Sequence, residues 1–260
     1  MTFIALDIGN SRTKYGFFPD ETPVVLPVPL SSGADDTDSF EHFRSWFASL
    51  PREKGFRWHI AATNERRRRL FDEWFAAHRP EEKIIDLTID RIPISMNIDA
   101  PDKIGIDRLL TAFGAIQLRR GESPLPFLVI DAGTATTVDL VSAENVFLGG
   151  AILPGLESSA SALSRISPRL PKMKPSEISF AAFPGKNTVE ALAAGIMGSA
   201  VGAIRHYHSA VEPSGGVPIY LTGGDAELIE NGLRPFFDAE LLLHVPNLVL
   251  SSIAAVSQNF

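Results

Sequence analysis

The stretch Ile4–Phe18, IALDIGNSRTKYGFF, decides the fold that we predict for this chain. An apolar run ends at Asp7, the turn-forming segment Gly9-Asn10-Ser11 follows, and a second extended run begins at Tyr15. This order predicts a strand, a tight turn and a second strand. Because glycine and asparagine tolerate a positive φ, the backbone amides of such a turn can point inward and bind an anion.

The side chains around this turn suit a phosphate group and its metal ion. Asp7, at the predicted end of the strand, can bind Mg²⁺ directly or through water. Ser11, Arg12 and Lys14 supply a hydroxyl group and two cations for phosphate oxygens. The turn is therefore predicted to hold the phosphates of a nucleotide.

The same pattern returns in the second half of the chain. Aligned on the aspartates, LDIGN at residues 6–10 matches IDAGT at residues 130–134, and both copies continue through hydroxyl residues into an extended run. The offset between Asp7 and Asp131 is 131 − 7 = 124 positions. Two such hairpins, each opening a domain-sized half, predict two loops that bind the phosphates of one nucleotide from both sides of a cleft.

Composition and charge bound the class of protein. With 260 residues, of which 45% are hydrophobic, the chain can form two domains, each with its own core. The net charge of −7 and the pI near 5.4 argue against a general nucleic-acid coat and fit an enzyme that acts on a small molecule. The absence of cysteine excludes disulfides, thiolate nucleophiles and zinc–cysteine sites. Without a basic leader or an apolar run of ~20 residues, the chain is interpreted as cytoplasmic and not in a membrane.

Strand and helix patterns alternate along the first half of the chain. Apolar residues at helical spacing predict helices near residues 40–50 and 70–75, and extended runs lie at 57–62, 84–87 and 92–98. This alternation favours an α/β fold. The segment 121–126, GESPLP, is predicted to be the domain boundary, which gives domains 1–121 and 122–260.

Four consecutive arginines, Arg66–Arg69, lie at the start of the second predicted helix. Such a run can indicate a nucleic-acid surface. Four consecutive helical positions spread around the helix axis, however, so a solvated face is the favoured interpretation. His206 and His208 are two residues apart and do not share a helical face, so they are not predicted to be a metal pair.

A second group of candidate residues lies at the start of a helix predicted to begin near Gly105. Asp107 and Arg108 fall in its first turn. They can serve merely as a favourable charge near the helix dipole and a surface cation. Free backbone amides at such a position also bind anions, however, and we favour a functional role. Asp107 is then the acceptor for the proton of an attacking hydroxyl, and Arg108 binds a substrate carbonyl, a carboxylate or the transferring phosphate.

Three features farther along the chain are weaker signals. The proline-rich segment 167–185 is a candidate substrate loop, in which Lys172 and Lys174 are interpreted as solvated. Asn187-Thr188 is predicted to cap the following helix, with Thr188 as the N-cap and contact to substrate as a second role of Thr188. The Gly223-Gly224 turn permits close approach of a flat ring or ribose, and a simple tight turn between strand and helix explains it nearly as well.

Taken together and in order, these motifs resemble one family over essentially the whole chain. The set DIGNSRTKYG, GIDRL, DAGTATTVD, GGAILPG, GKNT and LTGGDA is similar to the type III pantothenate kinases, a branch of the acetate kinase, sugar kinase, Hsp70 and actin superfamily. The resemblance implies two ribonuclease H-like domains with a nucleotide cleft between them, and a homodimer with pantothenate near its interface. It also implies ATP-dependent phosphorylation of pantothenate, the first step toward coenzyme A.

The resemblance assigns roles to individual residues. It implies that Asp107 accepts the proton of the pantothenate hydroxyl, that Asp7 binds Mg²⁺, and that Asp131 holds a monovalent cation, K⁺ or NH₄⁺. The residues implied to bind ATP and its phosphates are Asp7, Ile8, Gly9, Asn10, Ser11, Arg12, Thr13, Lys14 and Thr134. Those implied to contact pantothenate are Gly105, Ile106, Asp107, Arg108 and Thr188.

Two positions depart from the family pattern. Ser11 replaces the usual threonine and keeps its hydroxyl group, whereas Ile98 stands where members commonly carry a tyrosine that contacts pantothenate. Since isoleucine cannot make that hydrogen bond, a kinase acting on a different small alcohol is one alternative. The other is a nucleotide-binding accessory or transcriptional regulatory protein of the Bvg accessory factor type that transfers no phosphate, which the acidic pI disfavours.

Overall fold

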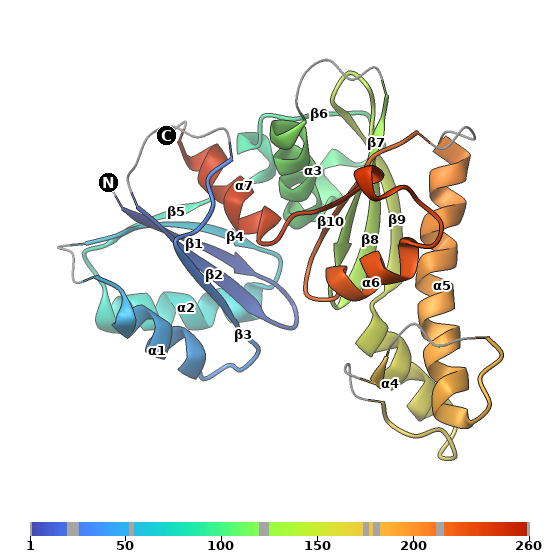
Figure 1. Ribbon diagram of the computed structural model, residues 1–260. Coiled ribbons are helices and arrows are strands. Elements are labelled where there is room, and N and C mark those ends of the chain that lie inside the picture. The colour runs from blue at the N-terminus through green and yellow to red at the C-terminus, as the bar shows by residue number, and fades with distance from the viewer. Residues whose placement is uncertain are drawn as a thin grey trace. The chain divides into compact units, whose positions relative to one another are not determined.

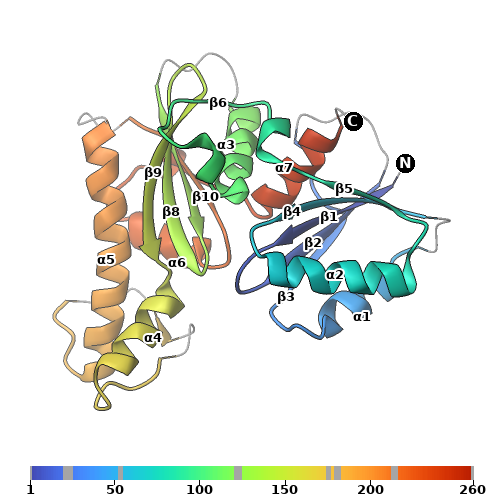
Figure 2. The same ribbon diagram turned by 180° about the vertical axis from the view of Figure 1, so that it is seen from behind.

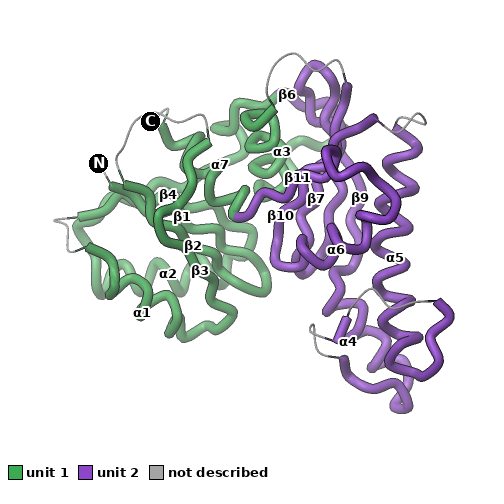
Figure 3. Tube along the Cα trace, viewed as in Figure 1, with its two compact units in different colours: residues 1–94, 99–120, 247–260 green, residues 95–98, 121–246 purple. Residues whose placement is uncertain are grey.

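The computed structural model describes residues 2–19, 26–51, 55–119, 125–173, 177–178, 183–211 and 216–258. The chain forms two compact α/β units (Figure 3): unit 1 comprises residues 1–94, 99–120 and 247–260, and unit 2 comprises 95–98 and 121–246. The predicted domain division at 121/122 stays a prediction, and the compact units differ from it at 95–98 and 247–260. Residues 121–124 of the predicted boundary segment lie outside the described residues.

The sheet of unit 1 is built around its first strand. Strand β1 (Phe3–Ile8) pairs with β2 (Thr13–Phe18) in antiparallel and with β4 (Arg57–Ala62) in parallel orientation. Strand β3 (Ser31–Asp35) joins β2 and β5 (Lys83–Asp86) joins β4, so the order is β3-β2-β1-β4-β5. All six residues of β1 are buried, as expected for a central strand with both faces covered. The predicted first hairpin is therefore confirmed.

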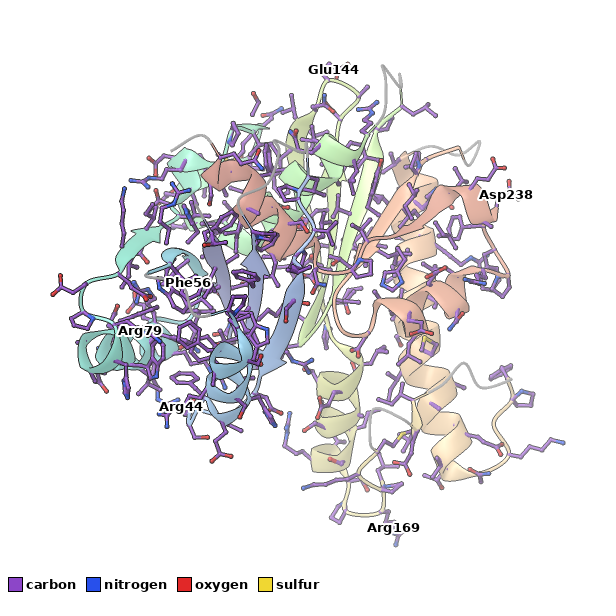
Figure 4. All side chains as sticks on the ribbon, turned by 60° about the vertical axis from the view of Figure 1, so that its left-hand side comes forward. Arg44, Phe56, Arg79, Glu144, Arg169 and Asp238 are labelled. Carbon is purple, nitrogen blue, oxygen red and sulfur yellow. The ribbon has the colours of Figure 1, made fainter. Side chains whose placement is uncertain are left out.

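Helices cover both faces of this sheet (Figures 1 and 2). On one face, α1 (Glu41–Ser49) and α2 (Glu65–His78) contribute Phe43, Phe71 and Trp74 to an aromatic core against alternate residues of β1. Phe56 belongs to the same core, whereas Arg44 extends from the outer side of α1 (Figure 4). On the other face lie α3 (Ile106–Leu118) and α7 (Leu248–Ser257). These two helices contact closely at Gly114, where a Cβ atom would overlap the side chains of Ser252 and Leu248.

Unit 2 repeats the central arrangement of unit 1. Strand β7 (Phe127–Ala132) pairs antiparallel with β8 (Ala135–Val141) and parallel with β10 (Ile219–Thr222). The remaining strands, β9 (Val146–Pro154), β6 (Ser95–Met96) and β11 (Leu242–His244), complete the order β11-β10-β7-β8-β9-β6. Glu144 lies at the tip of the turn between β8 and β9 (Figure 4). The duplicated strand-turn-strand pattern is thus present in both units.

The helices of unit 2 are α4 (Leu156–Ile166), α5 (Thr188–Val211) and α6 (Ala226–Leu233). Residues from all three pack against alternate positions of β7, including Leu128 and Ile130, to form the core of this unit. Among the described residues, short 3₁₀ segments include Ile89–Arg91, Pro101–Lys103 and Ala239–Leu241. Within the described ranges, none of the helices is both long enough and apolar enough to cross a lipid bilayer.

The arginine run of α2 has a structural role. Arg67 is buried, and its guanidinium donates to the backbone carbonyl oxygens of Asp36 at 2.7 Å and Asp35 at 3.4 Å. Arg66 pairs with Asp38 at 2.6 Å, and Arg68 pairs with Asp86 at 2.9 Å. The expectation of a solvated face is therefore wrong for Arg67, because this side chain ties α2 to the connection between β3 and α1.

We expect Arg67→Ala to destabilise the protein by about 2–3 kcal/mol, because it leaves two carbonyl oxygens without their charged donor. Arg69→Ala, at an exposed position of the same helix, is the matched control and is expected to change stability by less than about 0.5 kcal/mol. Urea denaturation followed by circular dichroism measures both values. Equal effects of the two substitutions would contradict the structural role of Arg67.

His59 of β4 gives the fold a dependence on pH. The residue is 1% exposed, and its Nδ1 atom is buried without a hydrogen-bond partner among the described residues. Burial lowers the pKa of His59 from 6.5 to about 4, and the positive charges of Arg57 and Lys83 contribute to this lowering. The folded state therefore holds His59 neutral at pH values where the unfolded chain already binds a proton.

We predict that this histidine costs stability as the pH falls from 6.5 to about 4, because only the unfolded state gains a proton in that window. The loss at pH 4 is roughly 3 kcal/mol, since each pKa unit corresponds to about 1.4 kcal/mol. His59→Leu should flatten this part of the stability profile, measured by urea denaturation at several pH values. A profile of unchanged slope in the variant would show that His59 is not the responsible group.

Candidate functional site

The turn between β1 and β2 carries the first candidate site. Asp7, the penultimate residue of β1, is 7% exposed and lies opposite Lys14 of β2. The Nζ atom of Lys14 is 3.7 Å from Oδ2 of Asp7. The N–H of Gly9 donates to the carbonyl oxygen of Arg12 at 3.1 Å and closes the turn. The predicted acid and cation therefore lie together at the base of an exposed turn.

Strand alternation divides the predicted phosphate-binding residues into two groups. Ile8 and Thr13 are paired across the hairpin and are both fully buried. Thr13 is also opposite Asp35 of β3, on the face that α1 and α2 cover. Since adjacent residues of a strand point to opposite faces, these two side chains are turned away from the side that carries Asp7 and Lys14. Only the backbone groups of Ile8 and Thr13 can reach a ligand bound beside Asp7.

The start of α3 carries the second candidate site. Gly105 is the N-cap, and Asp107 and Arg108 lie half-buried in the first turn, as predicted. Oδ1 of Asp107 accepts the N–H of Arg108 at 2.9 Å, and this N–H also lies 3.2 Å from the carbonyl oxygen of Gly105. The Asp107 carboxylate folds back so far that a Cβ atom at position 105 would overlap it. The side chain is thus oriented by a backbone donor, in space that is free because Gly105 has no side chain.

In unit 2, Asp131 occupies the position in β7 that Asp7 occupies in β1. It is opposite Thr137 of β8 and Thr222 of β10, so the carboxylate lies between two threonines on one face of the sheet. Oγ1 of Thr137 is buried and has no hydrogen-bond partner among the described residues. A carboxylate beside hydroxyl groups is a donor set of hard oxygens, which suits a cation rather than an anion.

The turn after Asp131 is fixed by contacts that the sequence motifs did not reveal. The carbonyl oxygen of Thr134 accepts the N–H of Gly155 at 3.0 Å and the hydroxyl of Ser158 at 2.7 Å. A Cβ atom at Gly155 would overlap this backbone, so glycine is required there. Gly155 and Ser158 therefore fix this turn. Gly155 closes the motif GGAILPG, whereas sequence reasoning missed Ser158, which lies outside every motif.

The Gly223-Gly224 turn lies directly beside the same aspartate. Gly223 has φ +100°, and a Cβ atom there would overlap the carbonyl oxygen of Ala132 and come within 2.6 Å of Oδ1 of Asp131. The N–H of Asp225 donates to the same carbonyl oxygen at 2.9 Å. The glycine thus lets the turn between β10 and α6 approach the end of β7, which explains this motif independently of any ligand.

At the start of α5, the predicted cap at Asn187-Thr188 is confirmed for Asn187, whereas the choice of Thr188 as the N-cap is wrong. Oδ1 of Asn187 accepts the N–H of Glu190 at 3.0 Å, and Oε2 of Glu190 accepts the N–H of Lys186 at 2.7 Å. This reciprocal pair is a capping box, with Asn187 as the N-cap. Thr188 takes the first helical position with an exposed side chain, because the helix begins there and the residue before it, Asn187, occupies the N-cap.

Five other residues that the sequence singled out are placed as follows. Lys172 is exposed, as predicted, and Lys174 lies outside the described residues. Of the two histidines of α5, His206 is exposed and His208 is buried, with its Nε2 atom 2.9 Å from the carbonyl oxygen of Val217. Ile98 lies against Gly149 of β9, where a Cβ atom would be 3.5 Å from its Cγ2 atom.

Comparison with known protein families identifies one matching family and several relatives of this chain. A family model described as type III pantothenate kinase matches residues 3–210. The type III pantothenate kinase of Thermus thermophilus is 31% identical over 247 residues, which cover 90% of this chain and 92% of that protein. The one from Sulfurihydrogenibium sp. is 28% identical over 89% of this chain and 91% of its own length. The one from Rhodopirellula baltica is 37% identical over 170 residues, which span 59% of that protein and 64% of this chain.

Comparison with solved structures supports the fold. The ethanolamine utilization protein EutJ of Carboxydothermus hydrogenoformans aligns with a TM-score of 0.59 at 12% identity, over 98% of this chain and 89% of its own. The activator of 2-hydroxyisocaproyl-CoA dehydratase from Clostridium difficile, solved with bound ADPNP, aligns with a TM-score of 0.56 at 13% identity, over 99% and 94%. At these identities the likeness concerns the fold alone, and it confirms the predicted actin-like, ribonuclease H-like class.

Proposed function

The chain belongs to the type III pantothenate kinase family, and from this premise we propose that it transfers the γ-phosphoryl group of ATP to the primary hydroxyl of pantothenate. This reaction is the first step of coenzyme A biosynthesis. The observation that carries the proposal beyond family membership is the fixed carboxylate of Asp107 at the N-terminus of α3. A carboxylate in one defined orientation beside helix amides suits a proton acceptor for an alcohol.

The proposal assigns the phosphates of ATP to the turn from Asp7 to Lys14. Exposed backbone and side-chain donors at Asn10, Ser11 and Arg12 can bind phosphate oxygens. Asp7 fits a magnesium ion, because its buried carboxylate at the end of a strand supplies a hard oxygen ligand. Magnesium would neutralise charge that develops on the phosphates during transfer.

A monovalent cation, K⁺ or NH₄⁺, is assigned to Asp131. The donor set supports this assignment, since Thr137 and Thr222 flank the carboxylate and Oγ1 of Thr137 lacks a partner among the described residues. Thr134, whose side chain is exposed on the adjoining turn, is assigned to ATP. The cation would supply positive charge near the nucleotide.

Phosphoryl transfer of this kind is catalysed mainly by positioning of the two substrates and by neutralisation of charge on the phosphates. The hydroxyl oxygen of pantothenate attacks the γ-phosphorus, the bond to the β-phosphate oxygen breaks, and ADP leaves. The proton of the hydroxyl passes to the carboxylate of Asp107, whose orientation is fixed through Oδ1. The residues assigned to hold pantothenate are Gly105, Ile106, Arg108 and Thr188, as the family resemblance implies.

We also propose that the active protein is a cytoplasmic homodimer, as the family resemblance implies. The alternative of a nucleotide-binding accessory or regulatory protein that uses its arginine run on DNA is not favoured, because Arg66, Arg67 and Arg68 are engaged within unit 1. An assay with ATP, Mg²⁺, K⁺ and pantothenate tests the proposed reaction directly, and light scattering tests the oligomeric state. A panel of other small alcohols tests whether Ile98 has changed the acceptor.

We predict that Asp107→Asn lowers kcat by about 10²- to 10⁴-fold, the usual contribution of a positioned proton acceptor. The amide keeps the shape of the side chain and its contact with the N–H of Arg108, so the Kd of ATP should change by less than about twofold. Steady-state kinetics and calorimetric titration with ATP measure the two quantities. Turnover at the wild-type rate would refute the role of Asp107.

We predict that Gly105→Ala lowers kcat by on the order of 10- to 100-fold, because the added Cβ displaces the Asp107 carboxylate from its position. The backbone itself tolerates alanine, since φ of Gly105 is −64°. Gly195→Ala is the matched control, because a Cβ atom there meets nothing within 4 Å. The control should retain full activity, and equal kcat values for the two variants would contradict the positioning argument.

A further inference from the structure

The turn that the proposed function assigns to phosphate is held by a residue outside every motif described above. Nδ2 of Asn64, in the connection between β4 and α2, donates to Oδ1 of Asn10 at 3.2 Å. The same connection is tied to the end of β1, because the N–H of Thr63 donates to the carbonyl oxygen of Ile8 at 3.0 Å. Residues more than fifty positions apart in the sequence thus meet at the phosphate turn.

The orientation of both amide groups follows from a backbone donor. Asn64 is the N-cap of α2, and its Oδ1 atom accepts the N–H of Arg67 at 2.9 Å. A backbone N–H can only donate, so the atom of Asn64 that faces Asn10 must be the amide nitrogen. Asn10 must then present its oxygen to Asn64. The Nδ2 group of Asn10, with its two N–H bonds, is left as a donor for another ligand.

This order of donors also has an electrostatic consequence. The N–H of Arg67 belongs to the first turn of α2, where the helix dipole places partial positive charge. Hydrogen bonds linked in series polarise one another in the same sense. The chain of bonds from Arg67 through Asn64 to Asn10 therefore favours an anion at the Nδ2 atom of Asn10.

We propose that Asn64 is a positioning residue for ATP, which holds the side-chain amide of Asn10 with its N–H groups directed to a phosphate oxygen. This inference rests on the proposed function, because it takes the turn after β1 as the phosphate site. A purely structural explanation is that Asn64 only caps α2 and that its contact with Asn10 has no consequence for binding. The two explanations predict different ATP affinities for a variant in which residue 64 still caps α2 but has no amide nitrogen.

Asn64→Ser separates the two roles. Serine caps helices about as well as asparagine does, but it lacks the amide that bridges to Asn10. We expect a midpoint of thermal unfolding within about 2 °C of wild type. The KM of ATP and the Kd of a non-hydrolysable ATP analogue should rise by about 3- to 10-fold, the size of one neutral hydrogen bond, with the KM of pantothenate unchanged. Asn231→Ser, at an exposed position of α6, is the matched control and should change none of these values.

A double-mutant cycle with Asn10→Ala provides the decisive comparison. If Asn64 acts only through Asn10, the double variant should bind the ATP analogue no more weakly than Asn10→Ala alone. Additive losses would overturn the proposal, and so would an Asn64→Ser variant with wild-type affinity for the analogue. The wild-type protein distinguishes failure of the proposed function from failure of this inference. If the wild-type protein binds no nucleotide, the proposed function and the positioning role of Asn64 are both refuted. If the wild-type protein turns over normally and the losses in the cycle are additive, only the positioning role is refuted.

Discussion

The structure depends on one constraint, which is the burial of a central strand on both faces. Every residue of β1 is buried, because helices cover both faces of the unit 1 sheet. A strand of this kind can carry a carboxylate only where it ends, since a charge within it would lose its hydration without a partner. Asp7 satisfies the constraint at the carboxyl end of β1, beside Lys14. Ligands of open α/β sheets bind at such strand ends, so the folding requirement also places the chemistry.

The same constraint, applied through strand alternation, separates binding residues from core residues within a single motif. Asp7 and Lys14 share one face of the hairpin, whereas Ile8 and Thr13 lie on the face that the aromatic core covers. In unit 2 the same geometry groups Asp131 with a threonine from each neighbouring strand. Asp131 has hydroxyl neighbours, whereas Asp7 has a lysine beside it. This difference supports different roles for the two turns, although their sequences match.

In each unit, the candidate residues are held in place by glycines and capping side chains rather than by a dense set of charges. Gly105 leaves room for the Asp107 carboxylate, and Gly155 and Gly223 allow other segments to approach the end of β7. Asn64 and Asn187 each satisfy an amide at the start of a helix, and the amide nitrogen of Asn64 also reaches Asn10 in the turn after β1. A backbone held in this way needs little rearrangement when charge develops, which is the condition for electrostatic stabilisation of phosphoryl transfer.

The sequence by itself determined what depends on neighbours along the chain. Turn residues after an apolar run fixed the hairpin at Asp7, its repetition fixed the second at Asp131, and apolar spacing placed Asp107 in the first turn of a helix. Tertiary structure decided what depends on segments far apart in sequence. It buried Arg67 under the loop after β3, turned the side chain of Thr13 to the core, joined residues 247–260 to unit 1 and brought Asn64 to Asn10. Periodicity along a strand or helix specifies which side chains share a face, but only packing specifies what that face meets, so no local pattern could have revealed these contacts.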